Sequence, residues 1–257
     1  MTSVLLKVED LVCRFSGLTA IANLTFDVMP GQIKAVIGPN GAGKSTLFNV
    51  IAGVTRPSEG RIWFDGERLD GLAPFQRAGR GIARTFQNLQ IFRELSVLEN
   101  VMVGRHLHGS VGLCQTILRG AALRSEERAI AAAAMELLEN FGLAGLAQLQ
   151  AGKLSFGQMK MLELARALAG EPRLLLLDEP AAGLPPAEAD RMAEIITSLN
   201  RRGMTVLLVE HNMRMVMSLA HEILVLNNGA RIAEGTAEQV RRQPEVIAAY
   251  LGEAADA

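Results

Sequence analysis

Residues 38–46 read Gly38-Pro39-Asn40-Gly41-Ala42-Gly43-Lys44-Ser45-Thr46, and this stretch decides the fold. It fits the phosphate-binding pattern G-x-x-x-x-G-K-[ST] at every fixed position. The apolar run at 33–37 is typical of a buried strand, and the run at 46–52 is typical of a helix start. Strand, glycine-rich loop and helix, in that order, are the context that the pattern requires. The sequence therefore predicts a nucleotide-binding loop.

The residue types of this loop indicate how it would hold a nucleotide. Glycines let successive backbone N–H groups face one anion, and the helix N-terminus adds a partial positive charge. Lys44 is expected to reach the β- and γ-phosphates, and Ser45 to place its hydroxyl on Mg²⁺. The loop is thus expected to bind both the phosphates and the metal that accompanies them.

The composition is that of an ordinary globular α/β protein, with 49% apolar and 21% charged residues among 257. A formal net charge of −1 gives no electrostatic reason to expect nucleic-acid binding. Cys13 and Cys114 fit no zinc spacing, so Mg²⁺ is the one metal expected. No stretch approaches the roughly 18 uncharged apolar residues of a membrane span, and residues 1–10 lack a signal-peptide core. We therefore expect a cytoplasmic chain that does not itself cross a membrane.

Three polar residues follow apolar runs that are typical of strands buried in a parallel sheet. Asp178 and Glu179 end the run at 173–177, and His211 follows the run at 205–209. Ligands bind at the carboxyl ends of parallel strands, so Asp178 is placed to hold Mg²⁺. Glu179 is placed to orient the attacking water, although a solvent-facing acid or a salt-bridge partner is the alternative. His211 is placed to contact the γ-phosphate and to hold that water in register.

The order of the expected elements indicates an α/β fold. Strands and helices alternate after about residue 166, which favours a parallel sheet. Mixed apolar and polar positions at 4–28 and 61–66 indicate a largely β layer around the loop unit. The alanine-rich segment from about 96 to 141 is helical in pattern, which predicts a helical insertion.

A five-residue stretch further along resembles the signature of the ABC ATPases. Residues 154–158 read Leu154-Ser155-Phe156-Gly157-Gln158 where that family has L-S-G-G-Q, and a helix is expected over Met159 to Ala169. Other family motifs match in order along nearly the whole chain. They are Phe15 (the aromatic residue that stacks on adenine), Gly38 to Thr46 (Walker A), Gln87 (Q-loop), Asp178 and Glu179 (Walker B) and His211 (switch histidine).

The resemblance implies a P-loop NTPase core of the RecA-like type, with an N-terminal antiparallel β-subdomain and an inserted α-helical subdomain. In those terms, residues 1–90 and 166–235 form the β-subdomain and the core. Residues 91–165 form the helical signature subdomain, and residues 236–257 form a C-terminal helix and tail.

The resemblance also implies that the chain hydrolyses ATP, with Glu179 and His211 as the catalytic residues. Mg²⁺ would be held by Ser45, Gln87 and Asp178. Gln87 would in addition contact the attacking water and sense the membrane partner.

A head-to-tail dimer that encloses two ATP molecules is implied as well. In such a dimer Ser155, Phe156, Gly157 and Gln158 of one subunit close on the γ-phosphate that Lys44 of the other subunit holds. Phe156 departs from the family pattern because it stands at a glycine position. Pro185 departs from it too, since an aspartate is usual there. Both departures leave the anion and water ligands in place, so we expect hydrolysis to persist and communication between the two sites to change.

A narrower resemblance, to the ATPases of branched-chain amino-acid importers, comes from residues 154–158, 180–184, 210–213 and 244–253. Urea-transporter and lipopolysaccharide-export ATPases share the last of these in part. The implied partners are a second nucleotide-binding subunit (a copy or a paralogue), transmembrane permease subunits and, indirectly, a periplasmic binding protein. The chain would lie on the inner face of the cell membrane. Residues 89–92 form an apolar patch that suits a permease helix, with core packing as the alternative.

Two other classes of protein are less compatible with the sequence. Soluble ABC ATPases that act on ribosomes or DNA usually carry two nucleotide domains or long coiled-coil insertions, and this chain has neither feature and no basic excess. A small-molecule kinase that shares only the phosphate loop would need neither residues 154–158 nor His211. The sequence thus favours a transporter ATPase.

Overall fold

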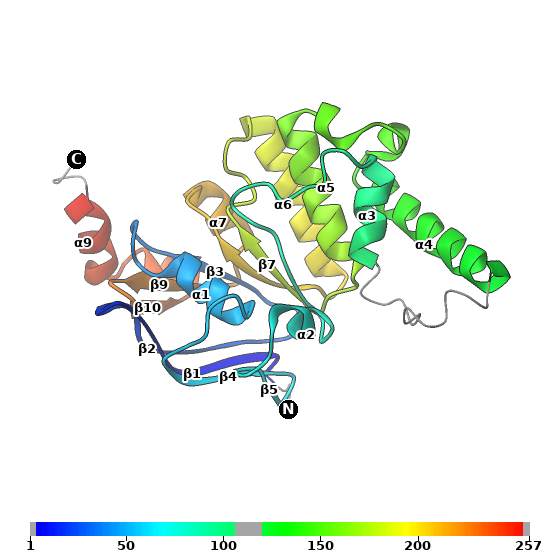
Figure 1. Cartoon of the computed structure of the whole chain (residues 1–257). Helices are drawn as coiled ribbons and strands as arrows, with labels where there is room; N and C mark the ends of the chain where they lie inside the picture. The colour runs from blue at the N-terminus through cyan, green and yellow to red at the C-terminus, as the bar shows by residue number, and fades with distance from the viewer. Residues whose placement is uncertain (1–3, 106–119, 254–257) are drawn as a thin grey trace.

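The computed structural model describes residues 4–105 and 120–253. Its centre is a six-stranded sheet in the order β10-β9-β3-β8-β7-β6 (Figure 1). The five strands from β9 to β6 run parallel, with Ile33 opposite Val206 and Leu174 opposite Thr205, and β10 pairs antiparallel with β9. The strands are β3 (Ile33–Ile37), β6 (Ile82–Arg84), β7 (Leu174–Asp178), β8 (Thr205–Val209), β9 (Glu222–Asn227) and β10 (Ala230–Gly235).

The middle strands β3, β7 and β8 are buried at every residue. This is expected of a parallel sheet that is covered on both faces. Successive side chains of a strand point to opposite faces, so Leu174 and Leu176 enter one core while Leu175 and Leu177 enter another. The continuous leucine run therefore serves two cores at once.

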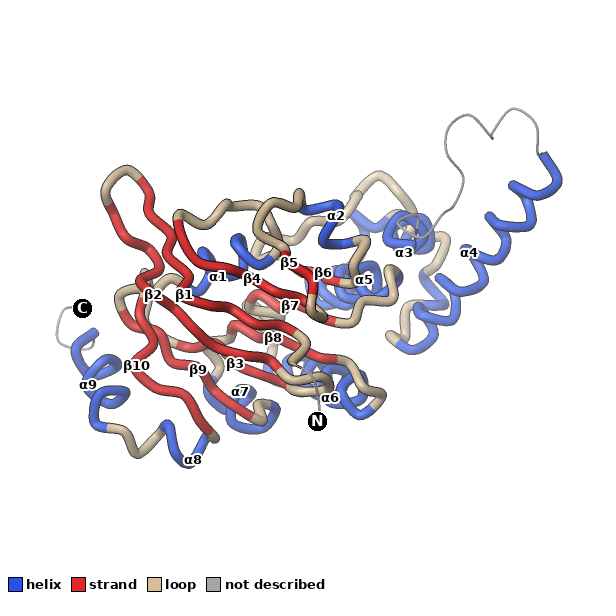
Figure 2. The backbone as a smooth tube through the Cα atoms, turned by 90° about the horizontal axis from the view of Figure 1, so that it is seen from below, coloured by secondary structure: helices blue, strands red, loops and turns tan. Residues whose placement is uncertain are grey.

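The first core lies between the central sheet and a second, antiparallel sheet in the order β2-β1-β4-β5 (Figure 2). Leu6 pairs with Val28 on one side and with Phe64 on the other. Phe48 of helix α1 is buried in the same core. The strands are β1 (Leu6–Phe15), β2 (Leu18–Val28), β4 (Glu59–Phe64) and β5 (Glu67–Arg68), and α1 spans Lys44–Ile51.

The second core lies between the other face of the central sheet and a group of helices. Leu162 of α5, Ile196 of α6, Val101 of α3 and Leu138 of α4 all belong to it. In Figures 1 and 2, α4 extends away from the rest of the molecule, at the end opposite α9. The helices are α3 (Val97–Arg105), α4 (Gly120–Asn140), α5 (Phe156–Ala169) and α6 (Pro186–Arg201), with 3-10 turns at Ala144–Leu146 and Ala151–Lys153.

Four further helices complete the described residues. Tyr250 and Val246 of α9 pack with Val240 of α8 and Val216 of α7 against the β9–β10 edge of the sheet. The helices are α2 (Pro74–Ala78), α7 (Met213–Leu219), α8 (Ala237–Val240) and α9 (Pro244–Glu253). Within the part of the chain that the structure describes, no helix combines the length and apolar character needed to cross a membrane.

Helix α5 and strand β10 differ from the prediction. Helix α5 begins at Phe156 and not at Met159, because the Ser155 hydroxyl oxygen accepts from Gln158 N–H and the Gln158 side chain accepts from Ser155 N–H. Strand β10 was not expected. It follows a turn at Asn228 and Gly229, whose φ values of 47° and 77° are those that a two-residue hairpin turn requires.

The predicted α/β fold, with its antiparallel N-terminal sheet and its separate group of helices, is confirmed. The subdomain boundaries at residues 90, 165 and 235 stay a prediction. Cys114 and most of the segment at 109–120 lie outside the described residues.

Candidate functional site

The phosphate loop, residues 38–46, joins the end of β3 to the start of α1. Gly38 and Gly43 have φ values of 148° and 100°, which L-residues with side chains rarely adopt. A Cβ on Gly38 would clash with the carbonyl oxygen of Leu226, and a Cβ on Gly43 would clash with that of Ala20. Conformation and space therefore both require glycine at these positions, which fixes the path of the loop.

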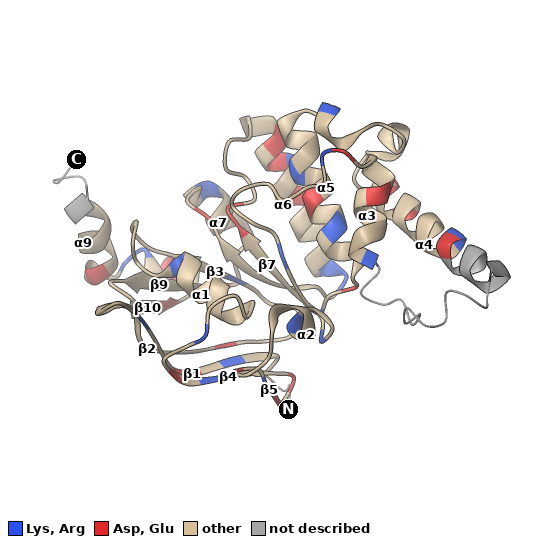
Figure 3. Cartoon of the chain, viewed as in Figure 1, with Lys and Arg blue, Asp and Glu red and all other residues tan. Residues whose placement is uncertain are grey.

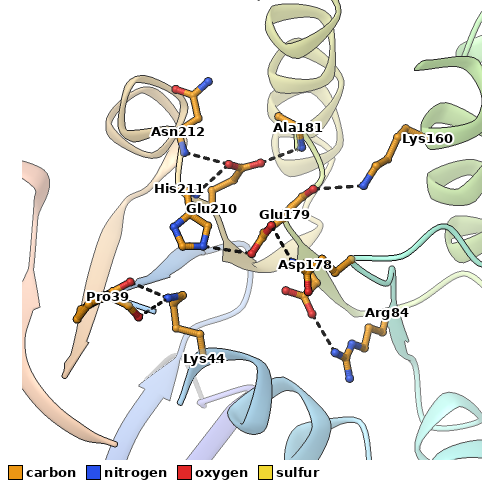
Figure 4. Close-up of polar contacts among 12 residues, drawn as sticks. Pro39, Lys44, Arg84, Lys160, Asp178, Glu179, Ala181, Glu210, His211 and Asn212 are labelled. Atoms are coloured by element: carbon orange, nitrogen blue, oxygen red, sulfur yellow. Dashed lines mark hydrogen bonds and ion pairs between the residues drawn. The ribbon is translucent and has the colours of Figure 1, made fainter. Parts of the chain in front are cut away.

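Lys44 is the first residue of α1, and its side chain turns back into the loop. Its Nζ donates to the carbonyl oxygens of Gly38 at 2.6 Å and Pro39 at 2.8 Å (Figure 4). Only 7% of the residue is exposed. Ser45 is exposed in the first turn of the same helix. The loop thus holds an ammonium group and presents a hydroxyl beside it, as phosphate and Mg²⁺ binding would need.

Asp178 ends β7 with its carboxylate buried. Its Oδ2 accepts from the Arg84 guanidinium at 2.9 Å. Its Oδ1 is buried and has no hydrogen-bond partner among the described residues. A buried carboxylate oxygen without a partner is costly unless something pairs with it, so this atom fits a metal or a metal-bound water.

Glu179 is held on both sides by two residues that the sequence predicts for the site. Its Oε1 lies 3.1 Å from His211 Nε2, and its Oε2 accepts from the Gln87 amide at 3.3 Å (Figure 4 shows the histidine contact). Its φ of 50° is rare for a non-glycine residue. The Glu179 N–H donates to Val209 O at 2.9 Å, which ties this conformation to strand β8. The carboxylate is therefore fixed at the carboxyl edge of the sheet.

Glu210 is a site residue that the sequence analysis missed. Its buried carboxylate accepts three backbone N–H bonds, from Ala181 at 2.8 Å, His211 at 3.0 Å and Asn212 at 3.1 Å. It thus connects the segment after Glu179 to the segment that carries His211 (Figure 4). The available signal was its position, because it is an acid directly after β8, just as Glu179 is directly after β7.

Helix α5 supplies two further residues that the sequence analysis missed. Lys160 is buried, and its Nζ donates to the Glu179 carbonyl oxygen at 3.3 Å. One oxygen of the buried Glu163 carboxylate accepts from Phe86 N–H at 3.4 Å and Gln90 N–H at 3.1 Å. Glu163 therefore holds the backbone on both sides of Gln87. No local sequence pattern predicts this role of Glu163, because Phe86 and Gln90 lie more than 70 positions away in sequence.

Burial raises the pKa of the Glu163 carboxyl, against the opposing effect of its two N–H donors. A carboxyl whose pKa is higher in the folded state favours folding when protonated. The free energy of unfolding of the wild type is therefore expected to fall, relative to Glu163→Gln, as the pH rises from below the ordinary carboxyl pKa through the raised value. Urea unfolding of both proteins across that range measures this difference.

The Glu163→Ala variant serves as the comparison in the same series. It leaves two N–H groups without their acceptor, at a cost of about 1–3 kcal/mol for each that stays out of reach of water. Glu163→Gln keeps a carbonyl oxygen for both. A pH-independent difference between the wild type and Glu163→Gln would contradict the raised pKa.

The signature residues lie elsewhere in this chain. Ser155 caps α5, and Phe156, Gly157 and Gln158 form its first turn. In Figures 1 and 2, α5 lies with α3 and α4, apart from α1. A Cβ added at Gly183 would lie 3.1 Å from the Phe156 ring, whose centre is 5.9 Å from Lys160 Nζ. The unusual aromatic residue therefore lies beside the segment that follows Glu179.

Phe15 lies at the end of β1, in the hairpin to β2, where it pairs with Leu18. Its side chain is exposed, so it is accessible to a ligand. The structure thus brings Gln87 and His211 into direct contact with Glu179, and Figure 4 shows Lys44 and Asp178 in the same region as Glu179 and His211. Phe15 and the signature residues come from other elements, the end of β1 and the start of α5.

Known proteins share this architecture and sequence. Residues 21–182 match the family model described as ABC transporter, and residues 230–256 match that of the branched-chain amino acid ATP-binding cassette transporter. The chain is 43% identical over 255 residues to the high-affinity branched-chain amino acid transport ATP-binding protein BraF of Pseudomonas aeruginosa. It is 42% identical to LivG of Escherichia coli, with the same function in its name. Each alignment covers 99% of this chain and 100% of the relative.

Solved structures agree with these sequence matches. A nucleotide-free ATP-binding cassette from an ABC transporter superposes with a TM-score of 0.84 at 34% identity, covering 96% of this chain and 99% of that one. A cassette in its ADP conformation superposes equally well, covering 98% of this chain and 100% of that one. The chain therefore belongs to the ABC transporter family, as one of its ATP-hydrolysing subunits.

Proposed function

We propose that this chain powers the import of branched-chain amino acids, by hydrolysing ATP beneath a pair of permease subunits. The observation that carries the choice of solute is the 43% identity to BraF over nearly the full length of both chains. The match at residues 230–256 supports it, because that model describes branched-chain amino acid cassettes.

Within the site, the phosphates of ATP are assigned to Gly38, Pro39, Asn40, Gly41, Ala42, Gly43, Lys44, Ser45 and Thr46, and the adenine to Phe15. Mg²⁺ is assigned to Ser45, Gln87 and Asp178. Asp178 Oδ1, which has no hydrogen-bond partner among the described residues, supports that choice. When bound, Mg²⁺ neutralises charge that develops on the phosphates. Glu179 accepts the proton of the attacking water, while His211 and Gln87 hold its carboxylate in place.

The proposed site is complete only when a second subunit joins it. Ser155, Phe156, Gly157 and Gln158 would come from a second copy or from a paralogue, and close on the phosphates held by Lys44. The separation of α5 from α1 within one chain supports this arrangement (Figure 1). The exposed hydroxyl and the first-turn N–H groups of α5 are suited to an anion.

The permease subunits are assigned to a groove of about 510 Å³ beside the Q-loop. Three residues of the predicted apolar patch line it, Gln90, Ile91 and Phe92. Phe92 is 49% exposed, which core packing alone does not require. Docking there would place the chain on the inner face of the membrane, with a periplasmic binding protein delivering the solute on the other side.

Replacing Phe92 with alanine is expected to weaken binding to a co-expressed permease pair. Truncating an aromatic anchor at an interface costs about 2 kcal/mol, or roughly thirtyfold in Kd. Quantitative co-purification in detergent measures the loss, with Ile247→Ala, an exposed apolar residue of α9, as the matched control. Equal retention of both variants would argue against this groove as the docking surface.

The solute is tested by uptake. Deleting the gene from its host should abolish the uptake of labelled leucine, isoleucine and valine. Restoring the wild-type gene should rescue this uptake, whereas restoring the Glu179→Gln gene should not. Uptake of labelled urea and lipopolysaccharide export are followed in the same strains. Unchanged leucine uptake together with loss of either other activity would overturn the proposed solute.

A further inference from the structure

Arg84 joins three parts of the site. It ends β6, three positions before Gln87. Its guanidinium donates to Asp178 Oδ2 at 2.9 Å and to Asn49 Oδ1 at 2.6 Å. Asn49 belongs to α1, the helix that follows the phosphate loop. One side chain therefore connects the phosphate-loop helix, the strand end with Asp178 and the Q-loop.

The surroundings of Arg84 leave its side chain little freedom. Only 9% of it is exposed, and only 3% of the Asp178 side chain. The Arg84 Cζ lies 5.0 Å from the centre of the Phe86 ring and 5.8 Å from that of Phe48. Hydrogen bonds along the guanidinium edge and rings near its face fix both its position and its plane.

This fixed guanidinium makes the two oxygens of Asp178 inequivalent. Oδ2 is engaged by Arg84, whereas Oδ1 is buried without a partner among the described residues. The Asp178 N–H donates to Thr85 Oγ1 at 3.3 Å, so the Asp178 backbone is also held by the side chain of the residue that follows Arg84. Without Arg84, rotation of the carboxylate would exchange its oxygens.

We propose that Arg84 is a positioning residue for ATP hydrolysis, which holds Asp178 so that Oδ1 is the oxygen available to Mg²⁺. The inference rests on the magnesium site proposed above. Arg84 acts through Asp178 and itself contacts neither metal nor nucleotide. Through Asn49 it also keeps Asp178 in register with the phosphate-loop helix.

Arg84→Lys is the discriminating substitution. Removing the charge would leave the buried Asp178 carboxylate uncompensated, which costs stability whatever the role of Arg84. Lysine keeps the charge, but its ammonium is a point charge and cannot reproduce the planar fork that spans Asp178 and Asn49. Asn49→Ala removes only the hydrogen bond between Arg84 and Asn49. It should also lower the apparent affinity for Mg²⁺, by less than Arg84→Lys does.

The test measures binding of a fluorescent ATP analogue to the full chain, with EDTA and along a Mg²⁺ titration. Affinity in EDTA should match the wild type in both variants, because the phosphate loop is intact. The apparent Mg²⁺ affinity should fall roughly 10- to 100-fold in Arg84→Lys, as is typical when a group that orients a metal ligand is changed.

Glu234→Gln is the matched control, because it weakens an ion pair with the buried Lys34, at the end of β3 away from the phosphate loop. The inference would be overturned if Arg84→Lys behaved like Glu234→Gln, with a lower thermal midpoint but the Mg²⁺ titration of the wild type. Arg84 would then stabilise the fold without positioning Asp178 for Mg²⁺. If Arg84→Lys does not fold, an unchanged titration in Asn49→Ala overturns it and a shifted one supports it. If the wild type shows no dependence on Mg²⁺, the magnesium site itself is wrong.

Discussion

Replacing Glu179 with glutamine is expected to reduce ATP turnover by roughly 10²- to 10⁴-fold, the usual contribution of a general base. Glutamine has nearly the same shape but cannot accept the proton of the attacking water. It can still accept a hydrogen bond from His211 or Gln87, which hold the wild-type carboxylate at 3.1 and 3.3 Å. The phosphate loop is untouched, so nucleotide affinity should stay within about twofold of the wild type.

The same variant should accumulate as an ATP-bound dimer, because binding closes the two subunits and only hydrolysis releases them. Light scattering coupled to size exclusion, with saturating ATP and Mg²⁺, measures the mass. Glu171→Gln is the control, because Glu171 is a surface acid paired with Arg105 away from the site. A Glu179→Gln protein that stays monomeric while the wild type dimerises would refute the closed-dimer arrangement.

Replacing Lys44 with alanine is expected to act on nucleotide binding itself. The ammonium group lies inside the loop, 2.6 and 2.8 Å from two of its carbonyl oxygens, where it would meet the phosphates. A hydrogen bond to a charged group contributes about 1.5–3 kcal/mol, so affinity for ATP should fall roughly 10- to 150-fold. Isothermal titration with ATP and Mg²⁺ measures the loss.

Two comparisons separate this effect from a loss of fold. The thermal midpoints of the wild type and of Lys44→Ala are compared without nucleotide. Their difference reports how much the contacts of Lys44 with Gly38 and Pro39 stabilise the empty loop. Lys7→Ala removes a surface lysine that pairs with Glu9 and should leave ATP affinity unchanged. An unchanged affinity in Lys44→Ala would count against the assigned phosphate site.

The parts that the sequence predicted are those set by local rules. The phosphate loop needs glycines at positive φ between a strand and a helix, and those residues are contiguous. Asp178, Glu179 and His211 follow apolar runs that are typical of buried strands, so their meeting at one edge follows from the parallel order of β7 and β8. The helical group was predicted from its alanine-rich pattern.

The parts that it did not predict depend on contacts between distant positions. Arg84 lies 94 positions from Asp178, and Glu163 lies 77 from Phe86. In sequence, such charged residues look like those of a solvated helix face or strand end, and only the packing of α5 and β6 buries them. Strand β10 is a different case: the Asn228-Gly229 pair predicts a turn, and the hairpin that this turn closes, with β10 as its second strand, was not predicted.

Each ATP site is expected to be shared between two subunits. This arrangement is tested by mixing two variants that each impair a different half of the shared site, Lys44→Ala and Ser155→Asp. Aspartate can still cap α5, as Ser155 does, but it places a negative charge against the phosphates.

A mixed dimer would have one site with an intact Lys44 and an intact Ser155 from opposite subunits. ATP hydrolysis in an equimolar mixture should then recover to at most about a quarter of the wild-type rate, since half the dimers are mixed and each has one intact site. Recovered hydrolysis is the predicted result. Complete inactivity of a mixture in which cross-linking shows the mixed dimer would contradict a shared site.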